Sequence, residues 1–139
     1  MVDQNCAYCM EGELVAKFGI KICELETSKV YLFKEQSHPG RCIVAHKKHV
    51  GDMNELTAEE RAAYFEDVAR VAKSNYEAFN QIRLTNGAYG DTGHHLHFHL
   101  CPKYKDEYEW GGVFLMNPDK KYLTDEEYAD MIEKIKANL

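Results

Sequence analysis

The stretch His94-His95-Leu96-His97-Phe98-His99-Leu100-Cys101 decides the fold assignment, because it combines a strand pattern with an unusual density of histidine. Of the 7 histidines in the chain, four lie here, and from the second onward they alternate with apolar residues. Successive residues of a β-strand point to opposite faces, so the pattern predicts a strand over His94–Cys101 that ends at Pro102. Three imidazoles would then share one face, and the apolar side chains between them would share the other.

A strand can hold His95, His97 and His99 in a fixed register that suits catalysis, since rigid elements position reacting groups better than loops do. Neutral imidazole is a good nucleophile, and with a pKa near ~6.5 most of it is unprotonated at neutral pH. A metal-binding strand without catalysis would carry the same histidines. The apolar alternation and the preceding glycine-rich segment Asn86–Gly93 favour a catalytic site, because such a segment lets backbone N–H groups approach a phosphate. His94 faces the opposite way and is expected to be packed or solvent-exposed.

The segments around this stretch follow an order typical of an α+β domain. Capping boxes predict the starts of two helices, a long one from Thr57 to about Gln81 and a C-terminal one from Thr124. Apolar runs bounded by turn residues predict further strands at Gly19–Glu26, Lys29–Lys34 and Arg41–His46. The hairpin-type links indicate an antiparallel sheet covered by helices, in one domain over residues 1–139.

Composition limits the partners of the chain. With a net charge of −6 and a pI near 5.6, it lacks the basic surface that nucleic acids and anionic membranes require. A small nucleotide needs only a local pocket and remains compatible with this charge. The chain has 5 cysteines, an odd number, and its N-terminal residues show no pattern of a secretion signal. We therefore expect the cysteines to be free thiols or metal ligands, in a cytoplasmic protein. No apolar run approaches the ~20 residues of a membrane helix.

The run His95–Leu100 resembles the signature of the histidine-triad (HIT) family, in which histidines alternate with apolar residues. Two further segments extend the resemblance over nearly the whole chain: Cys6-Ala7-Tyr8-Cys9 resembles the family's N-terminal zinc pair, and Pro39–Val50 resembles its second-strand motif. Pro102 and Trp110 also stand where many members have proline and tryptophan. The resemblance implies a HIT-like α+β fold, with a five-stranded antiparallel sheet, one long helix and a C-terminal helix, in a homodimer. Within the family it points to a zinc-bearing bacterial-type branch that resembles dinucleoside tetraphosphate hydrolases.

Family members form a covalent nucleotidyl intermediate on the middle histidine, which corresponds to His97 here. The resemblance therefore implies a nucleotidyl hydrolase or transferase that acts at the α-phosphate of a phosphoramidate, mixed anhydride or dinucleoside polyphosphate, with purine nucleotides as substrates. His99 is expected to bind substrate and to donate a proton to a phosphate oxygen or to the leaving group. Thr92, Gly93 and neighbouring backbone N–H groups are expected to contact phosphate oxygens, and Asn86 is a further candidate for substrate binding.

Zinc-bearing relatives use two cysteines, the histidine that ends the second-strand motif, and the first triad histidine. By this resemblance the ligands here are Cys6, Cys9, His49 and His95, a closed set of two sulfurs and two nitrogens that is typical of structural zinc. Such a site would orient the triad strand without activating water. His46 is an alternative ligand, and a C-x-x-C pair alone also occurs as a redox motif.

Several features keep two interpretations. Glu35 is either a ribose-binding residue or part of a solvated turn, and Trp110 with Tyr104 and Tyr108 either walls a nucleotide pocket across a dimer interface or packs in the core. At the level of function, the alternatives are a nucleotide-binding regulator with incidental turnover and a zinc-binding scaffold in which His97 is dispensable.

Overall fold

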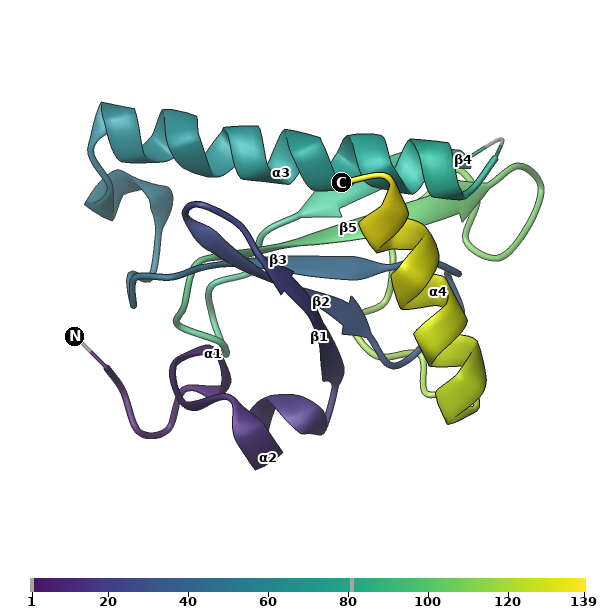
Figure 1. Cartoon of the computed structure of the whole chain (residues 1–139), viewed down its shortest axis with the longest axis horizontal. Helices are drawn as coiled ribbons and strands as arrows, with labels where there is room; N and C mark the ends of the chain where they lie inside the picture. Colours follow the sequence, from purple (N-terminus) through teal and green to yellow (C-terminus); the bar gives the residue numbers. More distant parts are fainter. Residues whose placement is uncertain (1, 81) are drawn as a thin grey trace.

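The sheet has five antiparallel strands in the order β1-β2-β3-β5-β4 (Figure 1). The computed structural model describes residues 2–80 and 82–139. The strands are β1 (Gly19–Glu24), β2 (Ser28–Phe33), β3 (Cys42–His46), β4 (Ile82–Gly87) and β5 (His97–Tyr104). The helices are α1 (Ala7–Met10), α2 (Gly12–Ala16), α3 (Ala58–Ala78) and α4 (Asp125–Ala137), with a short 3-10 turn at Met53–Glu55. The expected α+β architecture, with one long and one C-terminal helix, is confirmed.

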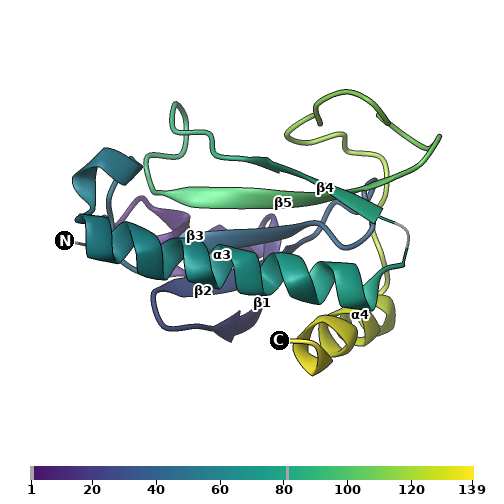
Figure 2. The same cartoon turned by 90° about the horizontal axis from the view of Figure 1, so that it is seen from above.

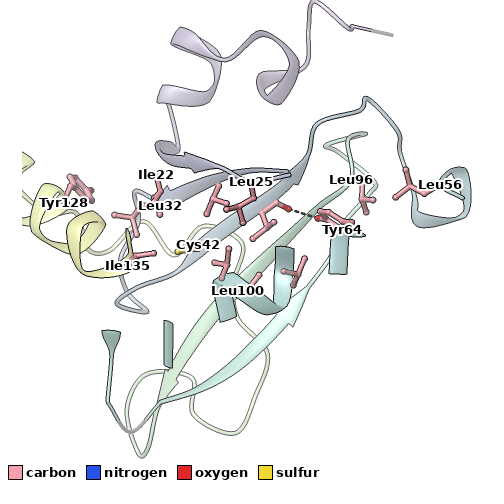
Figure 3. Close-up of a cluster of buried hydrophobic side chains, with 14 residues drawn as sticks. Ile22, Leu25, Leu32, Cys42, Leu56, Tyr64, Leu96, Leu100, Tyr128 and Ile135 are labelled. Atoms are coloured by element: carbon pink, nitrogen blue, oxygen red, sulfur yellow. Dashed lines mark hydrogen bonds between the residues drawn. The ribbon is translucent and has the colours of Figure 1, made fainter. Parts of the chain in front are cut away.

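Both faces of the sheet are covered, and each has its own apolar core. The long helix α3 and the C-terminal α4 lie on one side, and the N-terminal α1 and α2 lie on the other (Figures 1 and 2). The larger core packs α3 and α4 against alternate sheet residues, among them Leu32, Cys42 and Leu100 (Figure 3). The smaller core consists of Tyr8, Val15, Tyr31, Phe33, Ile43 and Ala45. A central strand such as β3 is therefore apolar on both faces, because neither face meets water.

Both predicted capping boxes form. The Thr57 hydroxyl accepts the backbone N–H of Glu60, whose carboxylate accepts the N–H of Thr57, and Thr124 and Glu127 repeat the arrangement at α4. The C-terminal end of α3 was expected at about Gln81, which lies outside the described residues. The helix ends earlier, at Ala78, since Phe79 is already extended at φ −125° and ψ 108°. No helix within residues 2–80 and 82–139 combines the length and the apolar character needed to cross a membrane.

The histidine strand β5 begins and ends three residues later than the alternation predicts, and Pro102 lies inside it. The Leu84 residue opposite Pro102 donates its N–H to the Tyr76 hydroxyl at 3.2 Å, so this pair carries no hydrogen bond between β4 and β5. The nitrogen of Pro102 therefore points toward the β3 side. Pairing with β3 ends at Leu100, so no ladder hydrogen bond is lost at the proline.

The β1–β2 hairpin is held to α3 by one buried carboxylate. Oδ2 of Asp67 accepts hydrogen bonds from the backbone N–H of Thr27, the Thr27 hydroxyl and the Ser28 hydroxyl, at 2.9, 2.8 and 2.7 Å. This contact closes the turn sooner than expected, with β1 ending at Glu24 and β2 beginning at Ser28. A helix residue 39 positions away thus fixes the register of the first two strands.

Replacing Asp67 with alanine should destabilise the protein, because three donors lose a charged acceptor in a buried place. We expect the free energy of unfolding, measured by urea denaturation, to fall by about 2–3 kcal/mol. The matched control is Glu66→Ala, an exposed residue of the same helix, which should change stability by less than about 0.5 kcal/mol. Equal effects of the two substitutions would refute the role of Asp67.

Candidate functional site

The three alternate histidines of the triad stretch lie on the sheet face opposite α3. His97 and His99 belong to β5, and His95 directly precedes it in an irregular segment that is held by a hydrogen bond from the N–H of Leu96 to the carbonyl of Val50 at 2.7 Å. All three histidines are buried. Leu96 and Phe98 between them, and Leu100 after them, belong to or pack against the larger core, where Leu96 and Leu100 are labelled in Figure 3. His94 is exposed.

A cleft of about 840 Å³ opens over this histidine face. Its walls come from the N-terminal segment, from β2 and from the loops that follow β4 and β5. Thr92 and Gly93 line the cleft, as do the aromatic side chains of Tyr8, Phe33, Tyr89 and Phe114. A volume of this size is typical of small-molecule sites.

Asn86 is not brought to this cleft. It lies in β4 directly opposite Leu100 and is exposed. Residues paired across two antiparallel strands share a face, so Asn86 lies on the α3 face of the sheet and not on the histidine face. The structure thus brings together His97, His99, Thr92 and Gly93 and separates Asn86 from them.

The ring of His97 has a defined tautomer. Its Nδ1 lies 2.7 Å from the backbone carbonyl oxygen of His95. A carbonyl can only accept, so Nδ1 carries the proton and Nε2 keeps its lone pair. Burial lowers the pKa of His97, which favours this neutral form. Gly93 leaves one side of the ring open because it has no side chain. A Cβ at this position would lie in van der Waals contact with the ring, 3.6 Å from Cε1 of His97.

The ring of His99 has the opposite arrangement. The guanidinium of Arg41 donates to its Nδ1, at 3.1 Å from Nη2 and 3.4 Å from Nε. Arginine cannot accept a hydrogen bond, so Nδ1 of His99 is unprotonated and the proton resides on Nε2. Burial, Arg41 and the neighbouring His97 lower the pKa of His99 to about 2. His99 is therefore neutral and can donate a hydrogen bond from Nε2, but it does not carry the second proton of a histidinium acid.

Cys6, Cys9, His49 and His95 converge at the end of the cleft, with all four ligand atoms within 4.8 Å of one another. Nδ1 of His95 lies 3.3 Å from Sγ of Cys6 and 3.1 Å from Nδ1 of His49, and Sγ of Cys9 lies 3.2 Å from Nδ1 of His49. A zinc ion bonded to sulfur at about 2.3 Å and to nitrogen at about 2.0–2.1 Å, with tetrahedral angles, requires distances between its ligand atoms that are close to these. The four side chains therefore fit a tetrahedral metal ion.

The alternative ligand His46 lies outside this cluster. Its ring Nδ1 accepts the backbone N–H of Lys48 at 2.9 Å, and its ring is buried against Tyr64. His46 contributes through its backbone carbonyl, which lies 2.6 Å from Nε2 of His95. This contact places the proton of His95 on Nε2 and directs Nδ1 to the cluster, as the partners of metal-bound histidines commonly do.

The remaining sequence candidates have other contacts. Glu35 is buried at the cleft wall, and its two oxygens accept from Ser37 and from the backbone N–H groups of Lys120 and Lys121, so it also tethers a loop. The Tyr104 hydroxyl donates to the carbonyl of Pro39. Trp110 is partly exposed and lies outside the residues that line the cleft.

Sequence reasoning missed several residues of the site, among them Arg41, Tyr8 and Phe114. Arg41 had a visible signal, a charged side chain directly before the apolar run of β3. Tyr8 also had one, because an aromatic residue between two candidate ligands must lie close to them, and its ring centroid is 5.1 Å from that of His97. Phe114 had none, since its place depends on how the loop after β5 folds.

Comparison with known proteins agrees with this architecture. The family model named HIT domain matches residues 19–106. The adenosine 5′-monophosphoramidase hnt1 of Schizosaccharomyces pombe is 27% identical over 110 residues, which cover 77% of this chain and 80% of that protein.

Two solved structures share the fold. A histidine triad protein of Sinorhizobium meliloti superposes with a TM-score of 0.84 at 22% identity, covering 92% of this chain and 95% of that one. A zinc-bound histidine triad family protein of Mycobacterium smegmatis superposes with a TM-score of 0.68 at 20% identity, covering 95% and 93%. Because the family match extends from β1 to β5 and includes the histidine face, this chain belongs to the HIT domain family.

Proposed function

We propose that this protein is a nucleotidyl hydrolase or transferase that works through a covalent intermediate on His97. The observation that carries the proposal is the hydrogen bond between Nδ1 of His97 and the carbonyl of His95, which leaves the lone pair of Nε2 unprotonated beside an open cleft. A neutral imidazole held in this way is an activated nucleophile.

The reaction takes place in two displacements at the α-phosphorus of a nucleotide derivative. In the first, Nε2 of His97 forms a bond to phosphorus while the bond to the leaving group breaks, and the leaving group keeps the electron pair and takes up a proton from solvent water. In the second, water or another acceptor attacks phosphorus and loses a proton, and the bond to His97 breaks. The ring returns to its neutral state, and a nucleoside monophosphate is released or transferred.

Neighbouring donors are suited to the charge that develops on phosphorus. Thr92 and Gly93 line the cleft next to His97 and offer a hydroxyl and backbone N–H groups to non-bridging oxygens. His99 offers its Nε2–H, because Arg41 occupies the other ring nitrogen. We assign His99 to hydrogen bonding of the phosphate and not to proton transfer, since its ring is neutral.

The substrate is inferred from the cleft and from one relative. Aromatic walls at Tyr8, Phe33 and Phe114 suit a flat base, and 840 Å³ accommodates a nucleoside monophosphate. The Schizosaccharomyces pombe relative is named for adenosine 5′-monophosphoramidate, so adenosine phosphoramidates are the first compounds to test. Dinucleoside polyphosphates and guanosine derivatives are the next. Assembly as a homodimer stays a prediction from the family resemblance.

We also propose that Cys6, Cys9, His49 and His95 hold a structural zinc ion. The donor set, its geometry and the zinc-bound relative of Mycobacterium smegmatis support this. All four positions of a tetrahedral ion would be filled by protein, so the ion would supply cross-linking and no activated water. It would fasten α1, and with it Tyr8, to the segment that leads into β5.

Replacement of His97 with alanine should abolish turnover, because no other group can form the bond to phosphorus. We expect release of adenosine monophosphate from adenosine 5′-phosphoramidate to fall by more than about 10³-fold. Quenched wild-type protein should gain the mass of one nucleotide on His97. The control is Glu66→Ala, an exposed residue of α3 that does not line the cleft, which should stay within tenfold of wild type. If His97→Ala also stays within tenfold, a binding or scaffold function replaces the proposed one.

Replacement of Cys9 with serine should remove the metal and lower the melting temperature without unfolding the chain. Structural zinc contributes ~10–16 kcal/mol in small zinc peptides, and a domain with two cores should depend on it less. Purified wild-type protein should contain about one zinc per chain by elemental analysis. Cys23→Ser, a β1 residue outside the cluster, should keep the ion. Zinc-free wild-type protein whose melting temperature does not respond to added zinc would exclude the site.

A further inference from the structure

Arg41 is a fully buried cation at the start of β3, directly below the cleft. Its guanidinium donates to Nδ1 of His99 and to the backbone carbonyl oxygens of Leu115 and Met116, both at 3.1 Å. Its carbon Cζ lies over two aromatic rings, 4.1 Å from the centroid of Phe33 and 4.6 Å from that of Phe114. Every contact is therefore to a neutral group.

Such a charge is expensive to bury. Among residues 2–80 and 82–139, no carboxylate lies within ion-pair distance of Arg41. A buried cation without a directly paired carboxylate costs several kcal/mol, partly recovered here by carbonyl dipoles, by ring faces and by the more distant carboxylates of Glu35 and Glu109. A neutral hydrogen-bond donor could make the same structural contacts at a lower desolvation cost. The positive charge of Arg41 is therefore not required for the fold.

The position of this charge determines the state of His99. The titratable groups that face its ring are Arg41, which directly precedes β3, His97 from β5, and Tyr89 from the segment after β4; Phe33 and Phe114 complete the surroundings. Of these, Arg41 alone is a permanent cation, and it occupies Nδ1. The proton of the ring is thereby confined to Nε2, and a donor polarised by a cation is a stronger hydrogen-bond donor.

The same guanidinium also fixes a wall of the cleft. Phe114 and Met116 line the cleft, and the carbonyls that Arg41 binds belong to Leu115 and Met116 in the same loop. The loop has a second, independent anchor in Lys103, whose ammonium donates to the carbonyls of Glu109, Gly112 and Val113. No hydrogen bond joins Lys103 to His99 within the part of the chain that the structure describes. The two anchors can therefore be separated by substitution.

We infer that Arg41 is a positioning residue for the proposed nucleotidyl transfer: it holds His99 as a neutral ring with its proton on Nε2, as a fixed, cation-polarised donor to the phosphate. The catalytic role that we assign to Arg41 rests on the proposed function, whereas its contacts with His99 do not depend on that function. It adds to that function a residue outside the histidine triad, which acts on the phosphate through His99 without touching it.

The tautomer of His99 can be read directly by two-bond 1H–15N correlation spectra of protein labelled at its histidines. The resonance of His99 is assigned by nuclear Overhauser contacts between its ring and the rings of Phe33 and Phe114. In wild type we expect an unprotonated Nδ1 and a protonated Nε2 throughout pH 5–8. This measurement uses the unaltered protein, so it decides the matter even where a variant fails to fold. A proton on Nδ1, or titration of His99 within this range, would overturn the inference.

Three variants then identify the cause. Arg41→Met removes the donor, so Nδ1 and Nε2 should share the proton and the pKa of His99 should rise, although burial still holds it below its usual range. Arg41→Lys keeps one charged donor and should restore the wild-type tautomer. Lys103→Met loosens the same loop and should leave the spectrum of His99 unchanged. A wild-type spectrum in Arg41→Met, or a Lys103→Met spectrum equal to that of Arg41→Met, would refute the role of Arg41.

Kinetics connect the tautomer to the reaction. With adenosine 5′-phosphoramidate as substrate, Arg41→Met should lose about 10²-fold in kcat with a much smaller change in KM, because a mispositioned donor affects the transition state most. Arg41→Lys should recover part of the loss. If nucleotidyl-His97 forms but the tautomer is not as stated, only the role of Arg41 fails. If the tautomer is as stated but no nucleotidyl-His97 forms, the proposed function fails, and with it the purpose assigned to Arg41.

Discussion

Each imidazole on the histidine face has one ring nitrogen tied to a fixed partner, and this constraint determines what the other nitrogen can do. His95 donates from Nε2 to the carbonyl of His46, which leaves Nδ1 to the metal cluster. His97 donates from Nδ1 to the carbonyl of His95, which leaves an unprotonated Nε2. His99 accepts at Nδ1 from Arg41, which leaves Nε2 as a donor. The partners alone thus suit three copies of one side chain to the different roles that we propose for them: metal ligand, nucleophile and hydrogen-bond donor.

This division of labour depends on the two-sided burial of β5. Leu96 and Leu100 anchor the segment in the core beneath α3, so the histidines on its other face cannot shift without disturbing that core. The opposite face has its own apolar packing, in which Tyr8 contacts the rings of both His95 and His97. Tyr8 stands between Cys6 and Cys9, so the cluster that would bind the metal also sets the wall beside His97. The candidate metal site and the proposed nucleophile are in this way parts of one packed unit.

Sequence patterns predicted the features that depend on residues close together in the chain. The alternation around His97 revealed the shared face, and the capping boxes at Thr57 and Thr124 revealed where the helices begin, because each pattern is complete within a few residues. The features that escaped prediction depend on pairing between distant segments. Pro102 is tolerated in β5 because β3 has already ended, a fact that no window around the proline contains.

The register of the strand pairing explains why Asn86 lies away from the site, although it was predicted there, and why Arg41 lies within it. Asn86 is close to the triad along the chain, yet its pairing with Leu100 turns it to the α3 face, and a shift by a single residue would have reversed this. Arg41 is far from His99 in sequence, at a separation of 58 residues, yet the β3–β5 pairing brings them into contact. The hydrogen-bonded pairing of strands decides which residues are neighbours in a sheet. A site formed by several strands therefore cannot be predicted from the sequence of one strand.

The charge of the cleft differs from that of the chain, and this contrast bears on what the cleft can bind. The protein has a net charge of −6, so its average field repels anions, whereas the cleft wall carries both signs: Asp3 and Asp91 lie on it together with Lys17 and Lys34. Exposed charges act weakly because water and salt screen them within about 8–10 Å. Arg41 is buried, so its charge is screened far less and acts at the depth of His99. A long polyanion would meet the acidic exterior along its whole length, whereas a single phosphate at His97 meets the buried cation and the neutral donors around it. The electrostatics of the fold therefore favour small phosphorylated ligands, the class of compound on which we propose that His97 acts.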